Sequence, residues 1–315
     1  MSGPVDETVL ASEGRGVSAI EIQEGRTTTI GRLGIVRVLP AKGRRAIGPW
    51  CFVDLMTPGD MEEPPPIEIG PHPHIGLATV TWLFDGAALH SDSLGTEQVI
   101  RPGQLNLMTS GHGIAHAELG VEMSSARATN GHMGVQMWLA QPEATRDAGS
   151  RFQHLGGLPV ADLDTGEGTV MVGGVAGAVS DAEVDHPTIG LDVTFRGRVD
   201  VPVEPAFEHA VVPIGDPLRV DDAIVEPGSL AYVPTGYDAL PIETRSGTSR
   251  FLLLGGEPLG VPVKMWWNFV ARTLDEITDA WRAWQDHDDD RFGPVSSELA
   301  RIDAPTPPWL REREG

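Results

Sequence analysis

Short runs of apolar or alternating residues, rich in Val, Ile, Leu and Thr, recur along most of the chain. They are separated by turn formers, since 38 glycines and 26 prolines are spread throughout the sequence. Many short strands with turn signals between them predict an all-β barrel or sandwich. The long helical periods that repeated βαβ units would need do not occur before residue 270. The predicted strands are 30–38, 77–84, 105–108, 135–139, 169–172, 191–195, 210–214, 230–233 and 251–254.

One amphipathic helix is predicted near the C-terminus. Thr273 and Glu276 have the spacing of a capping box, which marks the start of a helix. An apolar stripe with helical period follows, so we expect this face to pack on the core. The stripe consists of Ile277, Ala280, Trp281 and Trp284.

Two stretches, 102–118 and 227–243, align without a gap at an offset of 125 residues. The identical pairs are Pro102/Pro227, Gly103/Gly228, Leu105/Leu230, Gly111/Gly236 and Glu118/Glu243. This weak repeat predicts a duplicated β-barrel. Residues 141–168, rich in Gly, Asp, Pro and Ala, are the candidate linker between the two units. We expect an N-terminal barrel over residues 1–145, a C-terminal barrel over 146–272, and a helix and tail over 273–315.

Charge and composition exclude several classes of function. The chain has 315 residues with 23 Lys and Arg against 45 Asp and Glu, a net charge of −22. Such a surface repels phosphate backbones and anionic membranes, so we expect no direct nucleic-acid partner and no membrane partner. No apolar run is long enough for a transmembrane helix, and no secretory signal is visible. The single cysteine, Cys51, allows no internal disulfide and is expected to be buried, which favours a cytoplasmic location.

The histidines suggest a metal site. His72 and His74 lie in Gly-Pro-His-Pro-His-Ile-Gly, and His116 and Glu118 lie in Gly-His-Gly-Ile-Ala-His-Ala-Glu. On a strand, residues i and i+2 face the same side, so two such pairs on adjacent strands would surround one point. Three imidazoles and a carboxylate suit one divalent metal per chain and leave two octahedral positions open. Iron is our first choice, and the residues leave manganese, nickel, copper and zinc open.

Two further expectations concern the surroundings of this site. An alternative interpretation treats the histidine pairs as unrelated, with a surface turn at Pro73. In the second repeat, Pro241 occupies the column of His116, although Glu243 keeps the column of Glu118. We therefore expect a metal site in the N-terminal barrel alone. His90, in a Ser- and Asp-rich segment, is expected to be exposed to solvent.

Together these motifs resemble the pirin family of the cupin superfamily, over residues 30 to 292. The resemblance rests on the two histidine motifs at 72–76 and 111–118 and on the turn at Pro102-Gly103. Further matching segments are Gln136-x-Trp138, Phe152-Gln153, Gly256-Glu257-Pro258-Leu259, Asn268-Phe269-Val270 and Thr273. It implies a bicupin of two antiparallel β-barrels of jelly-roll type with a C-terminal α-helix. It also implies His72, His74, His116 and Glu118 as ligands of a metal, usually iron, in the N-terminal barrel.

The chain departs from the family pattern near the expected site. Ile75 and Ala78 stand where members commonly have Arg and Glu, and His112 stands where many have Arg. These changes predict a more apolar mouth of the cavity. Three more residues are candidates to line the cavity or to contact a metal ligand. They are His112, His132 and Gln136.

Two functions follow from the resemblance. The first is an iron-dependent dioxygenase that joins dioxygen to a quercetin-like flavonol or a related small aromatic, since some bacterial pirin-like proteins resemble quercetin 2,3-dioxygenases. Glu118 would then be a ligand and the catalytic base. The second is a non-enzymatic, iron-dependent redox-sensing regulator that binds a protein partner. Oxygen consumption that requires both substrate and metal distinguishes the enzyme from the regulator.

Overall fold

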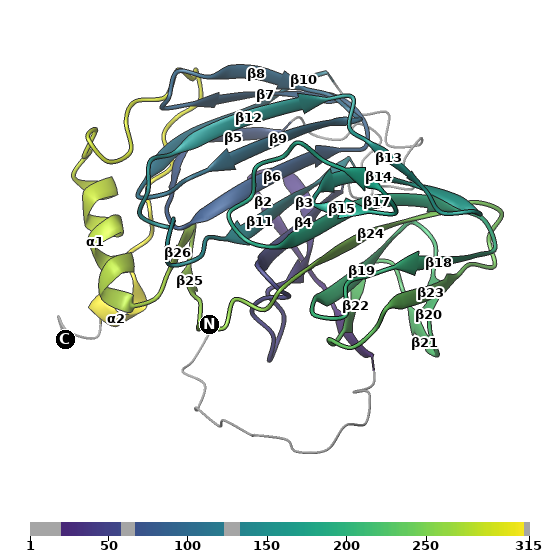
Figure 1. Cartoon of the computed structure of the whole chain (residues 1–315). Helices are drawn as coiled ribbons and strands as arrows, with labels where there is room; N and C mark the ends of the chain where they lie inside the picture. The colour runs from purple at the N-terminus through teal and green to yellow at the C-terminus, as the bar shows by residue number, and fades with distance from the viewer. Residues whose placement is uncertain (1–19, 58–66, 123–132, 312–315) are drawn as a thin grey trace.

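The chain folds into two antiparallel β-barrels packed side by side, with a helix at one end of the first (Figure 1). The structure is a computed structural model and describes residues 20–57, 67–122 and 133–311. Each barrel joins a seven-stranded sheet to a four-stranded sheet. The predicted all-β class with one C-terminal helix is confirmed, and all nine predicted runs contain strand.

The N-terminal barrel consists of one seven-stranded sheet and one four-stranded sheet. Its seven-stranded sheet has the order β12-β9-β6-β11-β4-β3-β2. These strands are β2 (Arg26–Ile30), β3 (Leu33–Leu39), β4 (Trp50–Thr57), β6 (Leu77–Leu83), β9 (Gln104–Thr109), β11 (Gly134–Ala140) and β12 (Arg151–Gly156). The four-stranded sheet contains, in order, β5 (Glu68–His74), β10 (Ile114–Glu122), β7 (Ala87–Asp92) and β8 (Glu97–Ile100).

The C-terminal barrel repeats this plan. Its seven-stranded sheet contains, in order, β1 (Glu21–Glu24), β22 (Ser229–Val233), β19 (Glu208–Ile214), β24 (Ser249–Gly256), β17 (Thr188–Phe195), β14 (Gly166–Val172) and β13 (Val160–Asp162). Its four-stranded sheet contains β18 (Arg198–Pro202), β23 (Ala239–Glu243), β20 (Leu218–Val220) and β21 (Ala223–Val225). The remaining elements are β15 (Gly174–Val175), β16 (Ala178–Val179), β25 (Lys264–Trp266), β26 (Phe269–Ala271), α1 (Leu274–Gln285) and α2 (Pro308–Arg311).

Two strands cross between the halves of the chain. β1, from the N-terminal segment, pairs with β22 in the C-terminal barrel. β12 lies after residue 145 but pairs with β9 in the N-terminal barrel. The predicted linker over 141–168 also contains β13 and the start of β14, so strands interrupt it. The predicted domain limits stay a prediction. Each barrel nevertheless includes one strand from the segment assigned to the other barrel, which is β1 in the C-terminal barrel and β12 in the N-terminal barrel.

The two seven-stranded sheets pack face to face. The shared core includes Val80 of β6 together with Val212 and Leu252 of the C-terminal barrel. Each of these sheets is therefore covered on both faces, which explains why all seven positions of β6 are buried. Trp82 Nε1 also donates to Asp192 Oδ2 across the interface, at 2.7 Å.

The predicted C-terminal helix is confirmed as α1. Thr273 is its N-cap, and its hydroxyl accepts from the amide of Glu276 at 3.2 Å. Ile277, Ala280 and Trp284 are buried as the stripe predicts, while Trp281 is partly buried. Cys51 is also buried, as expected, and burial raises the pKa of its thiol to about 12.

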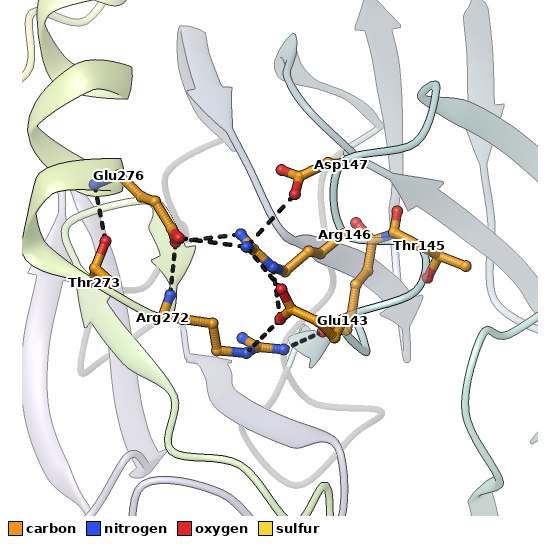
Figure 2. A network of polar contacts seen from close by, with 8 residues as sticks. Glu143, Thr145, Arg146, Asp147, Arg272, Thr273 and Glu276 are labelled. Carbon is orange, nitrogen blue, oxygen red and sulfur yellow. Dashed lines mark hydrogen bonds and ion pairs between the residues drawn. The ribbon is translucent and has the colours of Figure 1, made fainter.

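A charged network fixes the start of α1 to the loop after β11 (Figure 2). Arg146 donates from Nη1 to Glu276 Oε2 at 3.2 Å and from Nε to Glu143 Oε2 at 2.8 Å. The amide of Arg272 donates to the same Glu276 oxygen at 2.9 Å. The helix is therefore attached to the N-terminal barrel through charged contacts as well as apolar packing.

No helix within the described ranges is both long and apolar enough to cross a membrane.

Candidate metal centre

Two neighbouring strands bring three histidines together inside the N-terminal barrel. His72 and His74 lie on β5, and His116 lies on β10 directly opposite His72. Among the described residues these three form a group whose ring nitrogens all lie within 4.8 Å of one another, and all three side chains are buried. The alternative of a surface turn at Pro73 is wrong, because β5 continues through Pro73 to His74.

Two glycines of the histidine motifs allow the close approach of this region to its neighbours. Gly76 and Gly111 both have positive φ values, 64° and 51°. A Cβ at Gly76 would lie 2.2 Å from the carbonyl oxygen of Val270, and one at Gly111 would lie 2.0 Å from that of Ala148. The two glycines are themselves joined by a hydrogen bond from Gly76 N to Gly111 O at 2.9 Å. A side chain at either position would displace the end of a ligand-bearing strand.

The hydrogen bonds of the rings fix their tautomers. Nδ1 of His72 lies 2.9 Å from the carbonyl oxygen of Gly70, and Nδ1 of His74 lies 3.1 Å from that of Asn268. A carbonyl oxygen only accepts, so each Nδ1 carries the proton and each Nε2 keeps its lone pair. This is the arrangement that metal-binding histidines usually show.

His90 is the hydrogen-bond partner of Nδ1 of His116, as the backbone carbonyls are for His72 and His74. The expectation that His90 is exposed is wrong, because it is 3 % exposed and lies on β7. Its Nδ1 lies 3.5 Å from Nδ1 of His116, and its Nε2 lies 3.1 Å from Asp92 Oδ2. Asp92 also accepts from the amides of Leu94 and Thr96, which hold the carboxylate in place. A series of hydrogen bonds from the carboxylate of Asp92 through His90 thus holds the ring of His116 in place.

The electrostatics of the cluster suit a metal ion. Burial lowers the pKa of His72 to about 4. Burial, and then the neighbouring imidazoles, lower the pKa of His74 and His116 well below the ordinary value. Nε2 of His74 and Nε2 of His116 face each other at 3.0 Å. Two lone pairs at this distance repel unless a cation lies between them, and protonation is disfavoured, so the donor set fits a divalent metal.

Glu118 lies two residues after His116, in the same barrel interior. It is 6 % exposed, and its Oε1 accepts from Gln136 Nε2 at 3.4 Å. Gln136 in turn accepts from the hydroxyl of Thr81 at 2.8 Å. Burial raises the pKa of the Glu118 carboxyl. Its carboxylate is outside the three-histidine group, so its place as a ligand stays a prediction.

A cavity of about 380 Å³ opens beside these residues. His72, His74, Glu118 and Gln136 form part of its lining. The rest of the lining includes apolar and aromatic side chains and one ion pair. These residues are Leu33, Ile35, Arg37, Phe52, Asp54, Met56 and Trp138. The volume falls in the range of small-molecule sites, which is roughly 300–1,000 Å³.

The other two candidate residues have different outcomes. His112 is exposed and lines a second pocket with Arg146, Asp147 and Arg291, so the structure places it away from the cavity. This pocket adjoins the network of Figure 2. His132 lies outside the described residues.

Some parts of the site come from distant segments that local patterns did not indicate. Trp267, Asn268 and Ile302 all line the cavity, although they belong to the C-terminal segment. The amide of Val270 donates to Ile75 O at 3.2 Å, which ties this segment to the end of β5. The only sequence signal was the motif containing Asn268, which gave no indication of contact with His74.

The comparisons with known proteins agree with this architecture. Residues 32–139 match the model of the Pirin family, and residues 190–293 match that of the Pirin C-terminal cupin domain. A Pseudomonas aeruginosa protein named "Putative quercetin 2,3-dioxygenase" is 39% identical over 287 residues, which cover 90% of this chain and 89% of that protein.

Two solved structures extend the comparison. A quercetin 2,3-dioxygenase from Acinetobacter baumannii has a TM-score of 0.83 at 37% identity and covers 92% of this chain and 96% of its own. A bacterial pirin from Escherichia coli, solved in complex with nickel(II), has a TM-score of 0.58 at 15% identity, covering 76% of this chain and 100% of its own, and shows the shared fold alone. With both barrels matched in order and the relatives covering nearly the whole length, the chain belongs to the pirin family of two-domain cupin proteins.

Proposed function

We propose that this protein is a metal-dependent dioxygenase that acts on quercetin-like flavonols or a related hydroxylated aromatic. The observation that carries the proposal is the shared cavity, in which His72 and His74 of the three-histidine group line the same space as Phe52 and Trp138. A planar aromatic ligand could lie against this wall with its oxygen atoms toward the histidines. The names of the relatives from Pseudomonas aeruginosa and Acinetobacter baumannii support the same class of reaction.

The metal we propose is iron, held by His72, His74 and His116 with Glu118 as the fourth ligand. Imidazoles with one carboxylate are a typical donor set for non-haem iron. When bound, the metal would acidify the flavonol hydroxyl and offer positions for the substrate and dioxygen. The three neutral imidazoles supply no negative charge, so the carboxylate of Glu118 would balance part of the charge of the ion.

We propose Glu118 also as the group that takes the proton of the flavonol hydroxyl. Burial raises the pKa of Glu118, which brings a carboxylate nearer to the pKa that suits a general base at neutral pH. Gln136 Nε2 donates to Oε1 of Glu118 at 3.4 Å, which orients the carboxylate in the lining of the cavity. The surrounding apolar and aromatic side chains exclude water from this proton transfer.

Oxygen uptake tests the proposal. Iron-loaded protein is mixed with quercetin, and oxygen consumption and metal content are measured in parallel for the wild type, His116→Ala and Glu118→Gln. We expect catalytic uptake in the wild type, loss of metal and uptake in His116→Ala, and slower uptake in Glu118→Gln. Parallel samples loaded with nickel, manganese or copper test the choice of metal.

An inactive protein with full metal content would contradict the proposal. Lack of uptake with iron, nickel, manganese and copper alike would favour the regulator, in which the metal changes its redox state without turnover. Binding of a protein partner that differs between the ferrous and ferric forms would then be the next measurement.

A further inference from the structure

A row of polar side chains crosses the inner face of the seven-stranded sheet of the N-terminal barrel. Residues that are directly paired on neighbouring strands share a face of the sheet. Six consecutive strands contribute one such partner each, in an unbroken series of cross-strand pairs. The series runs Arg37, Asp54, Gln136, Thr81, Asn106 and His154.

The rows on either side of this polar row are different. One neighbouring row contains Ile35 opposite Met56, which belong to an apolar cluster. The other contains Phe52 opposite Trp138, whose rings are stacked with centroids 3.9 Å apart and an interplanar angle of 11°. The polar row is therefore a distinct stripe between apolar and aromatic surfaces, and its first three members line the cavity.

Arg37 and Asp54, at the end of the row that lines the cavity, form a bidentate ion pair. Arg37 Nε donates to Asp54 Oδ1 and Nη2 donates to Oδ2, both at 2.7 Å. The side chain of Asp54 is only 2% exposed, whereas that of Arg37 is 26% exposed. A buried ion pair is costly to desolvate and is weak evidence for a stabilising role. Its place in the lining of a ligand-sized cavity favours a role in recognition.

A continuous series of ring contacts joins this ion pair to the metal ligands. The guanidinium of Arg37 lies 4.4 Å from the centroid of the Phe52 ring. Phe52 stacks on Trp138, and Trp138 meets His74 edge to face with centroids 5.1 Å apart. A flat ligand lying on this wall would have one end at the histidines and the other at Arg37 and Asp54.

We propose that Arg37 and Asp54 determine substrate specificity by binding a phenolic hydroxyl on the end of the substrate remote from the metal. The inference rests on the proposed function, since it assigns the second end of a substrate whose first end meets the metal. A phenol can donate to the carboxylate of Asp54 and accept from a remaining N–H of Arg37. A methyl ether cannot donate, and a carboxylate would face the charge of Asp54. The substrate class is thus an aromatic with a chelating oxygen pair at one end and a free phenolic hydroxyl at the other.

The test compares matched flavonols under anaerobic conditions, where no turnover occurs. Binding to metal-loaded protein is followed by quenching of tryptophan fluorescence, because Trp138 and Trp267 line the cavity. The ligands are 3-hydroxyflavone, its analogues with one added hydroxyl at position 4′ or 7, and the corresponding methyl ethers. We expect one added hydroxyl to increase the affinity about tenfold, as a hydrogen bond to a charged group would. The methyl ether should bring no such gain.

The variant Arg37→Met/Asp54→Leu should abolish the preference for the hydroxyl while retaining the binding of 3-hydroxyflavone. Replacing both members of an ion pair by apolar residues is usually tolerated, which protects the fold. The matched control is Arg198→Met/Asp200→Leu, a pair on the exposed surface of the C-terminal barrel, which should keep the preference. A preference that persists without Arg37 and Asp54, or that is absent from the wild type, would overturn the inference alone. Failure of 3-hydroxyflavone to bind would overturn the proposed function as well.

Discussion

The two barrels share a plan of strands but differ in what fills them. In the C-terminal barrel, one row of paired residues across the large sheet is wholly apolar. The row runs Leu191, Leu253, Val211 and Ala231. In the N-terminal barrel, a row across the large sheet is wholly polar, and the small sheet opposite carries the three buried histidines.

This difference shows how a duplicated fold can divide its tasks. The C-terminal interior is a packed apolar core that stabilises the molecule through burial. The N-terminal interior contains a cavity of about 380 Å³ and several buried ionisable groups, both of which cost stability. The large interface between the two sheets links them, so the packed barrel supports the barrel that holds the site.

The largest difference between the barrels should be the loss of metal binding when the same substitution, histidine to alanine, is made in each. His116→Ala removes a buried ring from the three-histidine group, whereas His209→Ala removes a buried ring from β19 of the other barrel. We expect His116→Ala to weaken metal binding by more than about 100-fold, because even residues behind the ligands contribute 10- to 100-fold. His209→Ala should keep the wild-type metal content. Elemental analysis of purified protein, with circular dichroism to verify the β fold, makes the measurement.

Equal metal content in the two variants, whether lowered in both or kept in both, would show that the histidine group is not the binding site.

The strands and the histidine pairs could be predicted because they depend on local patterns. β6 and β24 contain the predicted runs 77–84 and 251–254 in large part, and the i, i+2 spacing places His72 beside His74. The repeat also mapped the right strands, since 102–118 covers β9 and the start of β10, while 227–243 covers β22 and β23. The Pro-Gly turn before β9 and β22 recurs with φ of 80° at both Gly103 and Gly228.

The alignment of the repeat does not show which face of a strand each residue occupies. Glu243, in the column of Glu118, points outward and pairs with Arg198 and Arg219. In β23 the buried positions are instead Leu240 and Ile242. The pairing of β10 with β5 shifts between His116 and Glu118, because β5 carries one extra residue there. Such irregularities leave no mark in an alignment of two sequences.

His90 and Asn268 could not be predicted for different reasons. The Ser- and Asp-rich segment after His90 does form a turn, in which Asp92 binds the amides of Leu94 and Thr96, but His90 itself precedes the turn on β7. Asn268 meets His74 across 194 residues of sequence. Its carbonyl, rather than its side chain, makes the contact, so residue identity gives no signal.

Packing should matter more in the C-terminal barrel than near the cavity. Leu253 is fully buried in the apolar row, and Leu253→Ala should lower the free energy of unfolding by about 3 kcal/mol through lost contacts and a new cavity. Met56→Ala, at the wall of the existing cavity, should cost less because the space it leaves joins a cavity that is already open. Denaturant unfolding of both variants gives the two values. A larger loss for Met56→Ala would reverse this part of the comparison.

His209 offers a pH test of the packed barrel. By alternation it shares the inner face with Val211, and neither ring nitrogen has a hydrogen-bond partner among the described residues. Burial lowers its pKa from 6.5 to about 4. Between these values the unfolded chain binds a proton that the folded chain does not, so stability falls as pH falls through this window. The loss attributable to this group reaches roughly 2 to 3 kcal/mol by pH 4.

His209→Leu should remove this part of the pH dependence and leave the rest. The measurement is the difference in unfolding free energy between wild type and variant at pH 7 and at pH 4.5. We expect the unfolding free energy of the variant to rise relative to that of the wild type as the pH is lowered. A difference that stays constant over this range would mean that His209 is accessible to protons in the folded state.

The smallest effect concerns the chain that links Asp92 through His90 to His116. His90→Phe keeps the stacking on Phe152 but removes the acceptor for Nδ1–H of His116, so the ring loses its fixed tautomer. We expect metal affinity to fall by about 10- to 100-fold, the usual cost of losing a partner of a metal ligand. His90→Gln, whose amide oxygen can replace the acceptor, should recover part of this loss, whereas His209→Phe in the other barrel should leave metal affinity unchanged. Competition with a chelator measures all three affinities. Wild-type affinity in His90→Phe would show that His72 and His74 hold the metal without a fixed His116, and that the polar interior of this barrel supports the site less closely than its geometry indicates.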